Sequence, residues 1–452
     1  MSRFILVLLV LARAASAEPY SRADVVKRAA LHPTTEAANS ETDQARAQKH
    51  QADALRWPRI SFSLGLITSL RATLKEGTQS DSVESGTSFG LGDVEPGGTA
   101  DLTIIQPLYT FGKIAERQRA AELGVAARTA QARMAQADVA VEGAELYERY
   151  LLARDMQRFL EETDHMLVRS IEATQERLAN KTPDTTQHDL LRLKTTRAPL
   201  LVGLHEATAG VAQAAAGLRA YFGLADNAPF EVADDRLAAL PFGNLTLPEL
   251  VARAYADRPE LAALADGAAS YDALARAESA GYLPDIVALG VVSGAYTVNH
   301  DAVESRYVYD PARHFVPFAG IGLRWELWGG LAGARAEEQH AHAAELRHLE
   351  SYARVALSAD VTNAYEQLAR AREDLPAVEE AYQSSKEWVV RATADYAVGM
   401  TDSITLRDAV EAYVTNRFAQ LEATYRLNIA LARLSRAIGA SGGTSLYAGG
   451  GR

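Results

Sequence analysis

The sequence contains no cysteine among its 452 residues. This absence excludes disulfide bonds, thiolate metal sites, a cysteine nucleophile and lipid attachment at an N-terminal cysteine. The sequence also has no phosphate-binding loop after a predicted strand, no nucleophile with a placed base and no paired carboxylates in a plausible cleft. We therefore predict that the protein is not an enzyme and that it uses no cofactor and no metal.

The chain has fewer basic than acidic residues. The chain has 46 Lys and Arg against 58 Asp and Glu, which gives a formal net charge of −12 at pH 7. This balance argues against a protein that binds nucleic acid. Apolar residues make up 48% of the chain, so it can bury a large core and is not disordered by composition.

Long apolar runs are missing after the first residues of the chain. The nine-residue run FILVLLVLA (Phe4–Ala12) follows Arg3 and precedes Ala15-Ser16-Ala17, which has the A-x-A pattern of a cleavage site. This run is too short to span a bilayer, so we interpret residues 1–17 as a secretory signal peptide. A buried N-terminal helix is the alternative. We expect an exported protein, and any membrane insertion must then use strands.

Four segments have the seven-residue periodicity of supercoiled helices. In the third of them, a row of apolar residues recurs at this spacing: Val361, Leu368, Leu375, Tyr382 and Val389. The predicted helices cover residues 113–180, 187–222, 333–397 and 403–438, and the sustained period predicts that they pack as coiled coils. At 1.5 Å per residue, a helix over residues 113–180 would be roughly 100 Å long. Pro199 and Pro376 fall inside these segments, where each predicts a kink.

Four shorter segments are strand candidates. They cover residues 58–70, 100–109, 284–298 and 316–328. In the first segment Ile60, Phe62 and Leu64 alternate with Ser61 and Ser63. Segments of about ten residues with one apolar and one polar face are typical of transmembrane barrels, although a single soluble strand gives the same pattern. On the polar face of the last segment we expect Arg324 and Glu326.

The strand and helix pattern occurs twice. WPRISFSLG at 57–65 matches YLPDIVALG at 282–290, and ADLTIIQPLYTFGKIAE at 100–116 matches GIGLRWELWGGLAGARAEE at 320–338. We predict two structural repeats, at 18–245 and 246–440, followed by a flexible tail at 441–452.

Each repeat contains a junction between a strand and a long helix. In the first repeat we expect Pro107 to end the strand ladder and Gly112 to bend the backbone into the helix. Gly329 and Gly330 occupy the corresponding place in the second repeat.

These junctions resemble those of the outer-membrane efflux protein family, the TolC-like exit ducts of Gram-negative bacteria. The resemblance also rests on Tyr396-Ala397-Val398-Gly399-Met400 and on the following Ile404, Leu406 and Asp408-Ala409. It implies a mixed α/β membrane protein in which three chains with four strands each form one 12-stranded outer-membrane β-barrel. An α-helical coiled-coil tunnel would continue the barrel into the periplasm.

The resemblance also implies functional residues at the periplasmic tips of the helices. Val398, Gly399 and Met400 would contact a periplasmic adaptor protein, whereas a plain helix C-cap is the alternative for this glycine. The first tip, Asn180-Lys181-Thr182-Pro183, has no glycine and is expected to be about two residues longer.

A periplasmic gate is implied next to the second tip. Asp408 and Thr405 would face the axis there, and Tyr396 would bond a first-repeat carboxylate, Asp189. Solvated residues on a helix surface are the alternative.

We therefore expect a homotrimeric, passive exit duct in the outer membrane that reaches into the periplasm. Its partners would be an adaptor, an inner-membrane pump of the RND or the ABC type, and outer-membrane lipid. A periplasmic coiled-coil adaptor and a soluble periplasmic enzyme are the alternatives. The adaptor would lack four bilayer-length amphipathic strands, and the enzyme predicts a monomer in the soluble fraction.

Overall fold

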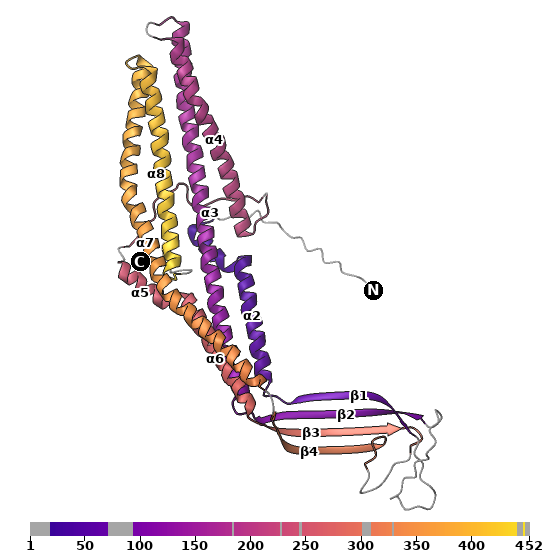
Figure 1. Ribbon diagram of the computed structural model, residues 1–452. Coiled ribbons are helices and arrows are strands. Elements are labelled where there is room, and N and C mark those ends of the chain that lie inside the picture. Colours follow the sequence, from indigo (N-terminus) through magenta and orange to yellow (C-terminus); the bar gives the residue numbers. More distant parts are fainter. Residues whose placement is uncertain are drawn as a thin grey trace, which may run out of the picture. The chain divides into compact units, whose positions relative to one another are not determined.

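The structure is a computed structural model that describes residues 19–70, 94–182, 185–226, 228–243, 246–300, 309–327, 330–440 and 446–447. The predicted signal peptide, Gly329 and most of the predicted tail lie outside these residues. The chain is mostly helical and has one four-stranded sheet (Figure 1). In the described part of the chain, none of the helices has a stretch that is both long enough and apolar enough to span a membrane.

Four long helices dominate the structure. They are α3 (Lys113–Ala179), α4 (Gln187–Phe222), α7 (Leu331–Val398) and α8 (Ser403–Ala437). Their ends lie within two residues of those predicted from the periodicity. Pro199 lies inside α4 and Pro376 inside α7.

The remaining helices are shorter. They are α1 (Arg22–Arg28), η1 (Ala29–Leu31), α2 (Pro33–Ala54), α5 (Leu247–Asp257), α6 (Pro259–Ser279) and η3 (Ala280–Tyr282). The sheet consists of β1 (Arg59–Leu70), β2 (Val94–Tyr109), β3 (Asp285–Thr297) and β4 (His314–Arg324).

The chain forms two compact units. The first takes in Met1–Glu41, Thr129–Ala263 and Glu350–Arg452, and the second takes in Thr42–Arg128 and Leu264–Leu349. Each unit thus combines segments from both predicted repeats. The sheet belongs to the second unit, whereas the tips of the long helices belong to the first.

The sheet is antiparallel throughout, with the strand order β1-β2-β3-β4. The strands β1 and β4 are therefore its edges. Register pairs Phe62 with Leu102, and pairs Leu102 in turn with Val292. Because side chains alternate between the faces of a sheet, these three residues share one face.

Two predictions about the strands were wrong in their bounds. We expected β2 to start at about residue 100 and its ladder to end at Pro107, but β2 starts at Val94 and continues to Tyr109. Pairing with β1 begins at Val94, which explains the early start. Pro107 pairs with Val287, and the register with β3 shifts between Pro107 and Tyr109. The proline thus marks an irregularity of the ladder, two residues before its end.

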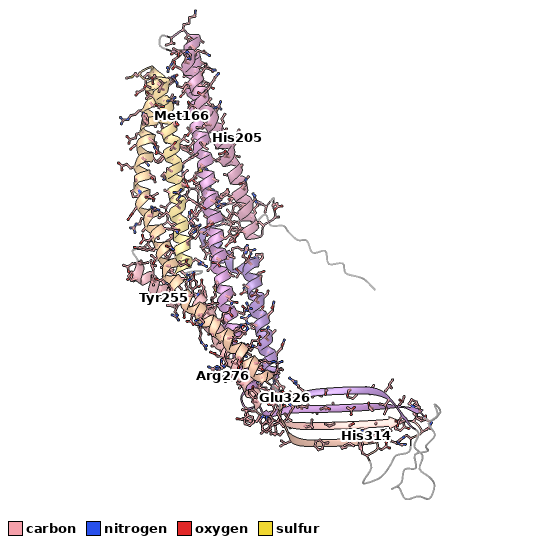
Figure 2. All side chains as sticks on the ribbon, viewed as in Figure 1. Met166, His205, Tyr255, Arg276, His314 and Glu326 are labelled. Carbon is pink, nitrogen blue, oxygen red and sulfur yellow. The ribbon has the colours of Figure 1, made fainter. Side chains whose placement is uncertain are left out.

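The last strand was also predicted too far along the chain. We expected it over 316–328, but β4 ends at Arg324, so Glu326 lies past its end (Figure 2). The reason is the partner strand, since β3 begins at Asp285, which pairs with Arg324. The indole N–H of Trp325 instead donates to the carbonyl oxygen of Tyr282 at 2.9 Å.

The junction between β2 and α3 is a tight turn. The N–H of Lys113 donates to the carbonyl of Thr110 at 3.1 Å, and the central residues Phe111 and Gly112 have φ of 51° and 90°. Positive φ at both central positions is the geometry of a type I′ turn, in which glycine avoids the steric cost that Phe111 accepts. At the other junction the carbonyl of Gly330 accepts from Ala334 at 3.0 Å, which starts α7.

Tyr221 fills a space between the N-terminal segment and α3 in the first unit. Its hydroxyl shares its proton between the carbonyl oxygens of Val25 at 2.9 Å and Val139 at 3.3 Å. The ring fits because residue 143 is glycine: a Cβ there would lie 2.3 Å from Cζ of Tyr221. Gly143 is therefore required by packing.

A buried carboxylate joins distant parts of the same unit. Oε1 of Glu148 accepts from Nε of Arg22 at 2.6 Å and from the Tyr447 hydroxyl at 2.8 Å, and Oε2 accepts from Nδ2 of Asn428 at 2.7 Å. The Glu148 side chain is fully buried. A buried carboxylate is tolerated only when it is paired and hydrogen-bonded, so this group ties α1, α3, α8 and the end of the chain together.

We predict that Gly143→Ala lowers the midpoint temperature of thermal unfolding, because overpacking of a filled core costs about 1–3 kcal/mol. Gly210→Ala is the matched control. Its Cβ would lie 3.6 Å from that of Ala153, which is ordinary contact, and alanine is the better helix former by about 1 kcal/mol. Circular dichroism should show a lower midpoint for the first variant and an unchanged or higher one for the second. Equal midpoints would contradict the packing argument.

Candidate functional site

The helix α7 ends in a Schellman motif at the second tip. The N–H of Met400 donates to the carbonyl of Asp395 at 2.8 Å, and the N–H of Gly399 donates to that of Tyr396 at 3.2 Å. Gly399 has a φ of 79°, in the left-handed region that this motif requires. Gly399 is therefore a helix C-cap, and contact between this turn and an adaptor stays a prediction.

The helix α3 ends in the same motif although the first tip has no glycine. The N–H of Lys181 donates to the carbonyl of Leu178 at 3.2 Å, and the N–H of Thr182 donates to that of Arg177 at 2.9 Å. Lys181 has a φ of 54°, a conformation that costs a residue with a side chain about 1–2 kcal/mol. Lys181 thus occupies the place that Gly399 holds in the second tip.

The two tips differ in length. The N-cap residue of α4, Thr186, lies five positions after Lys181, whereas the N-cap residue of α8, Asp402, lies three positions after Gly399. Pro183, which the sequence singled out in the first tip, lies outside the described residues.

The predicted bond between Tyr396 and Asp189 is corrected by the structure. The Tyr396 hydroxyl lies 2.7 Å from Oγ1 of Thr174 on α3, and both side chains are buried. Burial raises the pKa of Tyr396 above its ordinary value, which keeps the hydroxyl protonated and able to donate. The hydroxyl of Thr174 is the nearer partner because it projects from the facing helix into the same buried layer.

Arg177 caps the end of α7 from the neighbouring hairpin. Its Nη2 donates to the carbonyl oxygens of Tyr396 at 2.6 Å and Ala397 at 2.5 Å. The guanidinium carbon also lies 5.2 Å from the centre of the Tyr396 ring. The last carbonyls of a helix lack partners within it and carry partial negative charge. A cation from α3 therefore stabilises the second tip, a contact that sequence reasoning missed because no spacing relates residues 177 and 396.

Asp189 connects the start of α4 with the start of α8. Its Oδ1 accepts a hydrogen bond from the Ser403 hydroxyl at 2.5 Å. The oxygen of that hydroxyl in turn accepts one from Nη1 of Arg192 at 2.6 Å. Its Oδ2 accepts from the backbone N–H of Thr186 at 2.9 Å, the capping box that a Thr-x-x-Asp sequence signals.

These contacts set the ionisation of Asp189. Burial acts to raise the pKa of its carboxyl, but the hydrogen bonds from Ser403 and Thr186 outweigh it and lower the pKa below the ordinary value. A lowered folded-state pKa stabilises the fold above the unfolded value of about 4. That stabilisation is lost as the pH falls through the lowered pKa.

Most of the predicted tip residues line one cavity of about 550 Å³ between the two tips. These predicted residues are Asp189, Tyr396, Val398, Gly399 and Met400. Val398 and Met400 are 70% and 78% exposed, so the second tip presents apolar side chains to its surroundings. Within the described ranges, no group of three or more acidic or histidine side chains could hold a metal ion.

Thr405 and Asp408 lie on α8 beyond this cavity. The backbone N–H and the hydroxyl of Thr405 both donate to Oδ1 of Asp402, at 2.9 Å and 2.8 Å, as an N-cap contact. The carboxylate of Asp408 pairs with its neighbour Arg407, whose Nη2 lies 2.6 Å from Oδ1. Arg407 was not among the predicted residues.

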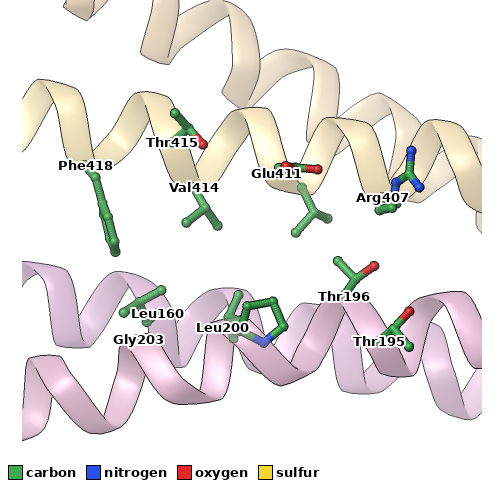
Figure 3. A pocket seen from close by; sticks show the side chains of 12 residues that line it. Leu160, Thr195, Thr196, Leu200, Gly203, Arg407, Glu411, Val414, Thr415 and Phe418 are labelled. Atoms are coloured by element: carbon green, nitrogen blue, oxygen red, sulfur yellow. The ribbon is translucent and has the colours of Figure 1, made fainter.

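A second cavity, of about 390 Å³, lies between α4 and α8 (Figure 3). Leu160, Leu200 and Val410 form a buried apolar floor. Pro199 lies at its rim; because proline has no N–H, the carbonyl of Thr195 lacks its usual helical donor there. Arg407 and Phe418 lie toward its opposite ends (Figure 3).

The second tip falls inside a segment that matches a known family. Residues 250–440 match the family model described as outer membrane efflux protein. This segment is an outer membrane efflux protein domain. It includes Val398, Gly399, Met400 and Asp408, and the resemblance inferred from the sequence is thereby confirmed. No curated protein matches the chain.

Solved structures extend the likeness of the efflux protein domain to nearly the whole chain. The outer membrane protein VceC from Vibrio cholerae is 18% identical, with a TM-score of 0.68 over 93% of this chain and 96% of that one. The outer membrane channel CmeC of Campylobacter jejuni is 14% identical, with a TM-score of 0.71 over 93% and 86%. The MtrE channel of Neisseria gonorrhoeae, solved in its open state, is 18% identical, with a TM-score of 0.66 over 93% and 90%. At these identities the likeness shows the fold, which is that of TolC-like channels.

We predict opposite effects of exchanging the left-handed residues at the two tips. Lys181→Gly should stabilise the first tip and Gly399→Ala should destabilise the second, each by about 1 kcal/mol. Hydrogen exchange of the Thr182 amide should slow in Lys181→Gly. Exchange of the Met400 amide should accelerate in Gly399→Ala. Val390→Ala, at an exposed position within α7 before the tip, is the control and should change neither rate.

Proposed function

We propose that this protein is an outer-membrane exit duct of a tripartite efflux or secretion system. It conducts substrates passively from a periplasmic adaptor and an inner-membrane pump to the exterior. The active form is a homotrimer that spans the outer membrane of a Gram-negative bacterium and extends into the periplasm. Both pump types, RND and ABC, are compatible with the chain.

The observation that supports this proposal most is the apolar face of the sheet. On β1 the side chains of Ile60, Phe62, Leu64 and Leu66 are 66% to 96% exposed. On β4 the side chains on the same face, Phe315, Ile321 and Leu323, are also exposed. A continuous apolar face of this kind is unfavourable in water and suits contact with lipid.

The free edges of the sheet support the trimer. Within the described residues of one chain, β1 and β4 each have a neighbour on one side only. An open edge in hydrocarbon leaves backbone groups unpaired at a cost of several kcal/mol each. Because β1 and β4 run in opposite directions, β4 of one copy can pair with β1 of the next, and three copies close a barrel of twelve strands.

The opposite face of the sheet would line a water-filled lumen. Asp101 accepts a hydrogen bond from the Ser293 hydroxyl at 2.6 Å on this face. Near the start of β3, Asp285 accepts from Nζ of Lys113 at 2.8 Å and pairs with Arg324. These charges can be solvated in a lumen, whereas lipid would not accommodate them. Glu326, beyond the end of β4, is no longer a member of this face.

At the helical tips we propose adaptor contact and gating. The exposed Val398 and Met400 beside the αL turn at Gly399 give an adaptor an apolar edge with fixed backbone geometry. The contacts from Arg177 and Asp189 hold the second tip against the first, so opening of the gate must break or reposition them. We propose that Thr405 and Asp408 lie at the narrow end of the tunnel, because the family resemblance implies a gate there.

We predict that an arginine on the two faces of β1 has opposite consequences. Phe62→Arg puts a charge into lipid, which costs about 2–4 kcal/mol near the bilayer centre, and should abolish heat-resistant trimers in the outer-membrane fraction. Ser63→Arg puts the same side chain on the lumen face, opposite Asp101 in the register, and should assemble normally. Gel electrophoresis without boiling measures both. Equal assembly of the two variants would overturn the assignment of the faces.

We further predict that the second tip contacts the adaptor. A photoreactive amino acid in place of Met400 should crosslink to one periplasmic adaptor in intact cells, identified by mass spectrometry. The same group at Tyr352, which is 72% exposed on α7 outside the tip, is the control and should give no adaptor product. If neither position captured an adaptor while trimers formed, the tip assignment would fail and the duct itself would stand.

The alternative function is that of a periplasmic coiled-coil adaptor. Only the long helical hairpins support this alternative, and it does not explain the four amphipathic strands. Extraction separates the two functions: a duct requires detergent, whereas an adaptor without a membrane anchor is released with the periplasmic fraction.

A further inference from the structure

Arg407 carries a full positive charge directly beside the carboxylate of Asp408. Its Nε and Nη2 lie 2.9 Å and 2.6 Å from the same oxygen, Oδ1 of Asp408. An arginine side chain is charged at neutral pH because of its high ordinary pKa, and the hydrogen bonds to Asp408 raise the pKa of Arg407 further.

We propose that Arg407 cancels the charge of Asp408 at the narrow end of the duct, so that this end neither binds nor selects cations. The inference rests on the proposed function, in which three copies bring these residues close to one axis. Three carboxylates alone would form a ring that attracts cations. Three neighbouring guanidinium groups make the same ring neutral, and Thr405 adds no charge to it.

The neutralisation does not require a permanently closed ion pair. The side chains of Arg407 and Asp408 are 42% and 44% exposed, and a pair exposed to this degree is weak and opens readily. However, a guanidinium on the adjacent residue stays within the Debye length of about 10 Å at 0.1 M salt. An approaching cation therefore meets both charges whether or not they are in contact.

Other acidic residues lie near Arg407, and they determine how much negative charge remains when its positive charge is removed. Glu411, one helical turn further along α8, adds to the raised pKa of Arg407 by its negative charge. Both residues line the α4–α8 cavity (Figure 3). Asp402 is engaged as the N-cap of α8 through Thr405, where the positive end of the helix dipole offsets its charge. Removing Arg407 would thus take from Asp408 the cation that pairs with it and from Glu411 the positive charge with which it interacts.

Ion selectivity of the purified trimer in planar lipid bilayers tests this inference. The permeability ratio of K⁺ to Cl⁻ follows from the reversal potential in a KCl gradient, and block is measured with hexaamminecobalt(III) added on the tip side. The wild type should resist block. Arg407→Gln should raise the ratio at least twofold and introduce block, whereas Asp408→Asn should lower the ratio.

Arg426→Gln is the matched control. Arg426 is an exposed arginine on the same helix, paired with Glu422, and its loss removes the same charge elsewhere on α8. It should leave both the ratio and the resistance to block unchanged. If Arg407→Gln behaved like Arg426→Gln, or if the wild type were already blocked, the inference would be overturned while the duct stood. Absence of conductance from the wild-type trimer would overturn the proposed duct as well.

Discussion

The pairing of backbone hydrogen-bond groups at the edges of the sheet is the constraint on which the rest of this structure depends. Four antiparallel strands satisfy one another's N–H and C=O groups in the interior of the sheet, but among the described residues β1 and β4 each keep one free edge. The apolar side chains on one face make lipid the suitable surrounding, and lipid does not tolerate free edges. In the proposed assembly other copies of the chain supply what one copy lacks.

The tips of the long helices solve a related problem by different means. A helix end leaves carbonyl groups without partners, and here both α3 and α7 satisfy some of them with Schellman motifs. Arg177 then adds a donor from the other hairpin to the end of α7, and Ser403 joins Asp189 to the start of α8. The two hairpins are therefore held together through the same groups that terminate their helices. A gate at this place would have to break or reposition these contacts.

Much of the fold could be predicted because the local patterns are strong. The seven-residue rows located the long helices, and the alternation of Ile60, Phe62 and Leu64 located β1. The predicted strand bounds were wrong where the neighbouring strand, and not the local sequence, determines where a strand begins or ends. β4 stops at Arg324 because β3 offers no residue before Asp285, and β2 passes Pro107 because β3 continues to pair beyond it. The partner of Tyr396 was missed for a similar reason, since Thr174 is 222 positions away in the chain.

The sequence by itself determined the periodicities, the turn residues and the charges, because each is a property of residues close together in the chain. It therefore specified the four long helices and the approximate places of the four strands, and that Gly399 ends α7. Only the tertiary structure decided which side chains meet: Arg177 with the end of α7, Glu148 with Arg22 and Tyr447, and Tyr221 with the space left by Gly143. These contacts depend on packing between segments that are distant in the chain, and no local pattern encodes them.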